Sequence, residues 1–149
     1  MSVSANFSGS IEPGQSSVIV QGSKTAAAIT KGDLLTLSSN EWVRAPAAAT
    51  AGPYAVALES KAAADPTIKV ALRGIVYVIA DGAINPNSPV KNATATAGQV
   101  IAAAVPTDSY SHIVGIYLGH ENEADGKTEA TAAADGDTIR ILLAGAGVV

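Results

Sequence analysis

Hydrophobic and polar residues alternate along several short stretches of the chain. Residues 67–72 read Thr, Ile, Lys, Val, Ala and Leu, and residues 75–79 form the most apolar stretch. A period of two is typical of a β-strand that buries one face. The same reasoning predicts further strands at residues 17–20, 34–37, 42–44, 54–59, 90–91, 99–102, 112–119 and 138–143.

Glycine-centred turns separate these strands. Lys31-Gly32-Asp33 and Asp135-Gly136-Asp137 each precede an alternating stretch. Glycine supplies the backbone freedom for a sharp turn, and an aspartate side chain can accept hydrogen bonds from the amides of the turn. Arg73-Gly74 predicts a bulge or a tight bend between two strands. The alanine-rich stretch within residues 45–52 is bracketed by Pro46 and Pro53 and predicts a loop with one helical turn at most.

These elements predict an all-β fold, a small β-barrel or β-sandwich of short antiparallel strands with a flexible N-terminal arm. Residues 1–14, rich in serine and glycine, are the arm, and residues 15–144 form a single β domain. Residues 145–149 make a short apolar C-terminal tail. A chain of 149 residues has the usual size of one domain.

Composition excludes several classes of partner and of site. The net charge is −4 and no cluster of Lys and Arg occurs, which argues against nucleic acid and against an anionic membrane surface. No apolar stretch reaches the roughly 20 residues that span a bilayer. The start of the chain lacks the pattern of a signal peptide, so synthesis in the host cytoplasm is expected. The absence of cysteine rules out disulfides and thiolate metal sites.

Candidate chemistry is sparse, and we expect no catalytic, cofactor-binding or metal-binding residues. The two histidines, His112 and His120, are eight residues apart, about 26 Å along a strand, which is too far to share a metal ion. Residues 121–126 are acidic but lack the ligand spacing of a calcium loop, so a solvated surface loop is favoured. The protein is therefore predicted not to be an enzyme.

Without site chemistry, the chain is expected to act through its surfaces. The apolar tail is a poor candidate for exposure to solvent, and burial of one valine side chain contributes about 1.5–3 kcal/mol. Trp42 lies beside a turn and is expected to anchor the core or its rim. The residues proposed to bind a partner come from the arm, the first strand, this turn and the tail: Phe7, Ile11, Val18, Val20, Trp42, Val148 and Val149.

The order of the strands and turns resembles a known family. The strands and turns that carry the resemblance are, in chain order, residues 31–37, 42–44, 54–58, 68–78, 113–118 and 135–142. In this order the pieces look like the small capsid decoration, or cement, proteins of tailed bacteriophages and related archaeal viruses. Two stretches depart from the pattern: residues 85–89 replace a glycine-rich turn, and residues 121–134 form a longer excursion.

The resemblance implies a structural protein of the virion. Such a protein binds the major capsid protein on the outside of an icosahedral shell, stabilises the mature shell, and often forms a homotrimer. Two other interpretations remain open. A carbohydrate-binding or adhesion domain would need exposed aromatic rings, which are few and scattered here. A small β-barrel enzyme would need a pocket that unites a histidine with a carboxylate.

Overall fold

The computed structural model describes residues 17–104, 107–108, 110–121, 128–129 and 131–143, so the predicted arm and tail lie outside the described residues. The fold is all-β, as predicted. Its elements, in chain order, are β1 (Val18–Ser23), β2 (Leu34–Ser38), β3 (Glu41–Arg44), β4 (Tyr54–Ala57), β5 (Thr67–Ile79), β6 (Pro89–Asn92), β7 (Val100–Ala102), the short 3₁₀ turn η2 (Tyr110–His112), β8 (Ile113–Glu121), β9 (Thr128–Glu129) and β10 (Thr138–Leu143).

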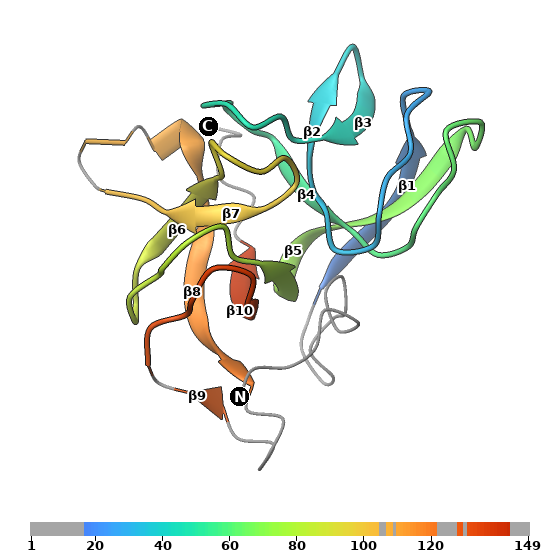
Figure 1. The fold of residues 1–149 in the computed structure, drawn as a ribbon. Coiled ribbons are helices and arrows are strands. Elements are labelled where there is room, and N and C mark those ends of the chain that lie inside the picture. The colour runs from blue at the N-terminus through green and yellow to red at the C-terminus, as the bar shows by residue number, and fades with distance from the viewer. Residues whose placement is uncertain (1–16, 105–106, 109, 122–127, 130, 144–149) are drawn as a thin grey trace.

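The strands form one curled antiparallel sheet in the order β3-β2-β4-β5-β10-β8-β6-β7, with β1 added to β5 and β9 added to β8. Figure 1 shows β5 between two groups of strands, β1 to β4 on one side and β6 to β10 on the other. The sequence suggested two strands joined at Gly74, whereas β5 is a single strand of 13 residues. Gly74 adopts a φ of 119°, which favours glycine, and it marks the point in this strand where the pairing changes from β1 to β10.

The first group of strands closes on itself. β1 pairs with β5, β5 with β4, β4 with β2 and β2 with β3, and a bridge between Lys24 and Trp42 joins the two ends. The interior is a cluster of buried side chains: Ile29, Leu35, Trp42, Ala55, Ala57, Ile68 and Val70. Gly22 allows the closure, because a Cβ at this position would lie 2.7 Å from Nε1 of Trp42.

The second group closes in the same way. β5 pairs with β10, β10 with β8, β8 with β6 and β6 with β7, and a bridge between Ala80 and Val100 returns to the end of β5. A larger apolar cluster fills this half, with Val76, Val78, Tyr117, Ile139 and Ile141 among its members. Gly115 of β8 lies against β10, where a Cβ at this position would be 2.1 Å from the Leu142 carbonyl oxygen.

Strand β4 forms a wall between the two cores. All four of its residues are buried, with Ala55 and Ala57 in the first cluster and Tyr54 and Val56 in the second. The side chains of β4 therefore point alternately into the two cores, and each core includes two residues of this strand.

The two Gly-Asp turns of the sequence have the same hydrogen bonds. Gly32 donates its N–H to Ala57 at the end of β4, and Gly136 donates to Ala80 just after β5. The carboxylates of Asp33 and Asp137 each accept the N–H of the residue three positions earlier, at 2.8 Å. Both glycines have positive φ angles, 92° and 87°. The turns predicted from sequence thus fix where β2 and β10 begin.

Candidate functional site

Of the residues proposed from sequence to bind a partner, the structure describes three. Val18 and Val20 lie on β1 and are 46% and 36% exposed. Trp42 is only 7% exposed and packs in the first core cluster, so it offers little surface to a partner. Phe7, Ile11, Val148 and Val149 lie outside the described residues.

In the described part of the chain, strand β1 carries three exposed apolar side chains in a row. Val18, Ile19 and Val20 are consecutive, and all three are exposed, Ile19 by 47%. β1 pairs with β5 along one edge. Among the residues that the structure describes, its other edge is bridged at Lys24 alone, where the chain meets Trp42. Figure 1 shows β1 between the β2–β3 hairpin and the first part of β5.

A second apolar surface lies on the other half of the molecule. Ile116 of β8 and Leu142 of β10 are direct cross-strand partners, 44% and 42% exposed. Pro89 of β6 pairs with Ile116, and Ile75 of β5 pairs with Leu142, which extends the row across four strands. Side chains that pair across strands share one face of the sheet, so these four form a continuous strip.

Both ends of the described domain meet β5 at neighbouring positions. Val18, the first residue of β1, pairs with Arg73. Leu143, the last residue of β10, pairs with Gly74. The segments before and after the domain therefore begin next to each other on the sheet, close to the exposed side chains of Val18 and Leu142.

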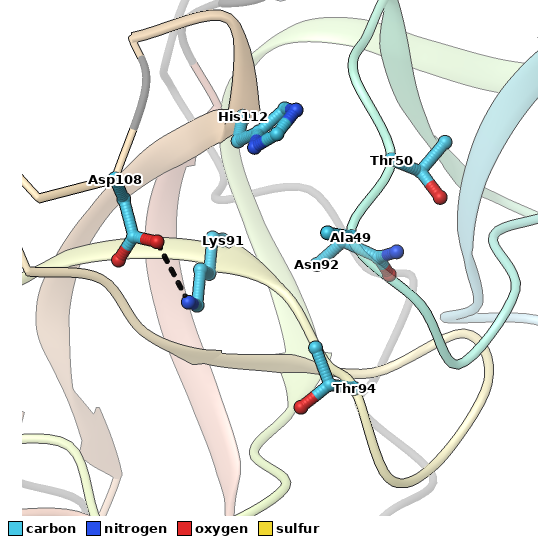
Figure 2. A pocket seen from close by; sticks show the side chains of 7 residues that line it. All are labelled: Ala49, Thr50, Lys91, Asn92, Thr94, Asp108 and His112. Atoms are coloured by element: carbon cyan, nitrogen blue, oxygen red, sulfur yellow. Dashed lines mark hydrogen bonds and ion pairs between the residues drawn. The ribbon is translucent and has the colours of Figure 1, made fainter.

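A small cavity lies between the loop that precedes β4 and strand β6 (Figure 2). Its volume is about 20 Å³, room for about one water molecule. The residues that line it are Ala49, Thr50, Lys91, Asn92, Thr94, Asp108 and His112. Asn92 donates to the carbonyls of Pro46 and Ala48 at 2.9 and 2.6 Å. The cavity is thus part of the attachment of this loop to β6, and it is too small for an organic substrate.

The charged pair at this cavity is Lys91 and Asp108. Figure 2 shows the two side chains pointing toward each other, and Nζ lies 2.9 Å from Oδ1. The other carboxylate oxygen of Asp108 accepts the N–H of Ala104 at 2.7 Å. That N–H and then the Lys91 ammonium hold the pKa of the Asp108 carboxyl below its ordinary value. Asp108 is therefore a paired anion that fixes the loop before η2.

The two histidines occupy separate environments. His112 lines the cavity, and His120 is 7% exposed near the end of β8. The Tyr117 hydroxyl donates to the Thr131 carbonyl at 2.9 Å and lies 2.7 Å from His120 Nδ1. A carbonyl can only accept and the phenol has one hydrogen, so His120 Nδ1 donates to the phenol oxygen. In the described part of the chain, no group of three or more His, Cys, Asp or Glu side chains could hold a metal ion.

One buried cation was not found from sequence. Lys24 is 3% exposed, and its Nζ donates to the carbonyls of Thr25, Ala62, Ala63 and Asp65 at 2.9–3.3 Å. These carbonyls belong mostly to the turn between β4 and β5. Local sequence around Lys24 gives no signal for this contact, because the acceptors come from residues about 40 positions later. The lysine ties β1 to that turn.

Comparison with known proteins gives one informative result. No protein family model matches the sequence, and no curated protein matches it. Among solved structures, the chain is similar to the N base of head fiber gp8.5 of bacteriophage phi29, with a TM-score of 0.57. The match covers 90% of this chain and 99% of that chain at 15% sequence identity. The chain shares its fold with a phage head-fiber base.

This likeness concerns the fold and spans nearly all of both chains. The family expected from sequence and the structural neighbour are both phage structural proteins, although the neighbour is a head fiber and not a decoration protein. The four aromatic side chains with described environments, Trp42, Tyr54, Tyr77 and Tyr117, are all buried. No helix among the described residues is long and apolar enough to cross a membrane.

Proposed function

We propose that this protein is a structural component of a phage virion that binds the outer surface of the icosahedral capsid and stabilises the mature shell. The observation that carries the proposal is the likeness in fold, over 90% of the chain, to the base of a phage head fiber. The partner is the major capsid protein, and the protein itself forms a homotrimer on the shell.

The surface of the domain supports a binding role. Two apolar surfaces are exposed, one on β1 and one across β8 and β10, and each is available for contact with another protein. Burial of such side chains contributes about 25 cal/mol per Å² of apolar surface removed from water. Several weak contacts made by one oligomer would add through multivalency.

A carbohydrate-binding domain displayed on a virion or cell has less support. Sugar-binding sites commonly use exposed aromatic rings, and the described aromatic side chains are buried in the two cores. Binding on a glycan array would revive this alternative.

Co-sedimentation with capsids tests the proposal. The purified protein is mixed with expanded, decoration-free shells of its own virus, and unexpanded shells serve as the control. Saturable binding to expanded shells alone is expected, and the bound copy number gives the symmetry of attachment. Absence of binding to both kinds of shell would overturn the proposal.

A further inference from the structure

The strip on the second half of the molecule is apolar along its whole length. It consists of Pro89, Ile116, Leu142 and Ile75, from four neighbouring strands. Ile116 and Leu142 are 44% and 42% exposed. The residues on either side of Leu142, Ile141 and Leu143, are buried in the core, so the side chain of Leu142 points outward. Contiguous exposed apolar side chains mark a place of contact with another segment or molecule.

The chain leaves the domain beside this strip. Leu143 is the last residue of β10, and it directly follows the exposed Leu142. The ladder between β10 and β5 ends there, since Leu143 pairs with Gly74 and the residue before it, Arg73, pairs with Val18 of β1. The terminal segment, residues 144–149, therefore begins two positions from an exposed member of the strip.

The terminal segment suits the strip in composition and in length. It reads Ala, Gly, Ala, Gly, Val and Val, with no charged or polar side chain. Six residues span about 20 Å when extended, whereas Ile116 lies only one strand beyond Leu142, about 5 Å away. The two glycines before the valines allow the chain to reverse its direction. Val148 and Val149 can therefore return to the strip.

The size of the strip favours a segment of the same chain over a separate molecule. A stable interface between two proteins uses about 20–30 residues on each side. The strip has four residues, far fewer than a second copy would need. A short flexible tether gives an attached segment an effective concentration in the millimolar range, so a small apolar contact is enough to hold it.

We infer that the terminal segment folds back over the strip of its own copy, with Val148 and Val149 packed against Ile116 and Leu142. These valines are two of the residues proposed from sequence to bind a partner, and in the free protein they cover the strip. A partner that binds the strip displaces them. The inference is separate from the proposed function, and none of its tests uses a capsid.

The order of the terminal segment is measured by ¹⁵N relaxation of Gly147, Val148 and Val149 in the full chain. We expect backbone order parameters of about 0.8, as in a rigid backbone, and not the values below about 0.6 of a flexible end. Ile116→Ser removes the central side chain of the strip and should lower these order parameters to the flexible range.

Val18→Ser is the matched control. Val18 is 46% exposed, close to the 44% of Ile116, and its partner Arg73 is next to Gly74, but it lies on β1. This variant should leave the terminal segment ordered. A dispersed amide spectrum reports whether each variant is folded, and Leu142→Ser replaces Ile116→Ser if the latter does not fold.

A reciprocal variant changes the segment and leaves the domain intact. Val148→Ser with Val149→Ser should shift the methyl signals of Ile116 and Leu142 and leave those of Val18 in place. In a mixture of ¹³C-labelled and unlabelled wild-type protein, nuclear Overhauser effects between these valines and the strip should arise within one copy only.

Four results would overturn the inference: a flexible segment in the wild-type protein, a segment that stays ordered in Ile116→Ser, equal loosening by Val18→Ser, or Overhauser effects between labelled and unlabelled copies. Shell binding is measured separately, so its absence with the segment ordered on the strip would refute the proposed function alone.

Discussion

Lys24 illustrates how a single side chain can join distant parts of a β fold. A lysine followed by threonine near the start of a small protein would ordinarily be assigned to the surface. Here the ammonium group is enclosed by backbone carbonyls, three of them from residues 62–65. The turn is further fixed by Asp65, whose carboxylate accepts the N–H of Ala62 at 2.9 Å.

Replacing Lys24 by methionine should destabilise the protein by about 2–3 kcal/mol, because buried carbonyls lose a charged donor. Urea unfolding followed by the fluorescence of Trp42 measures the change. Lys61→Met is the control: Lys61 forms only a 3.7 Å ion pair with Glu59, and both side chains are about a third exposed. Its loss should cost less than about 1 kcal/mol. Equal effects of the two substitutions would contradict the role given to Lys24.

Tyr54 predicts a dependence of stability on alkaline pH. Burial raises the pKa of its phenol to about 12 from an ordinary value of 10.0. The hydroxyl donates to the Thr50 carbonyl, a bond that the ionised form cannot make. Because the folded-state pKa lies above the unfolded value, the contribution is complete below about pH 10 and is lost as pH rises toward 12.

The measurement compares the urea midpoints of the wild type and of Tyr54→Phe from about pH 8 to about pH 12. The variant should be less stable near neutral pH, and the difference should shrink above about pH 10 as the wild type loses its proton. A difference that stays constant over this range would show that the ionisation of Tyr54 does not affect folding.

Among the elements, those set by local sequence were predicted well. The turn between β2 and β3 is one case, since it falls between the predicted strands 34–37 and 42–44 and Ser39 and Asn40 adopt φ angles of 52° and 65° there. The Gly-Asp turns are another. In each case the signal and the structure lie within a few residues of each other, so local backbone preferences determine the result.

Elements that depend on distant pairing were predicted less well. The sequence predicts a bulge or a tight bend at Arg73-Gly74 between two strands, whereas β5 is continuous and β1 and β10 pair with it on either side of this residue. The same limit applies to the candidate site. The exposure of Val18 and Val20 and the burial of Trp42 depend on which strands meet, and sequence periodicity does not contain that information.

The Asp137 turn provides a test at this scale. Asp137→Ala removes the acceptor for the Ala134 N–H and should cost about 1 kcal/mol. Asp135→Ala, an exposed position of the same turn, should change stability by less than about 0.5 kcal/mol. Thermal unfolding measures the loss of stability in the two variants. A comparable loss in both would show that the effect comes from the change in net charge and not from the hydrogen bond to Asp137.

For the whole molecule, the burial of β4 in both cores predicts a single unfolding transition. β4 contributes side chains to both cores, and β5 is a common strand of both halves. Val56→Ala removes volume from the second cluster and should cost about 2 kcal/mol. It should lower the midpoint reported by Trp42 in the first half as much as that reported by NMR signals of Tyr117 in the second. Two separate midpoints would indicate that the halves unfold independently.

The meeting of both chain ends at Arg73 and Gly74 has a mechanical consequence. A load applied between Val18 and Leu143 acts on the first residue of β1 and the last residue of β10, and the two strands extend from there in opposite directions along β5. It would therefore open the hydrogen bonds one after another, as a zipper opens, and would not shear a whole strand at once. Tension through the ends would release β1 first, because β10 is also held by its pairing with β8.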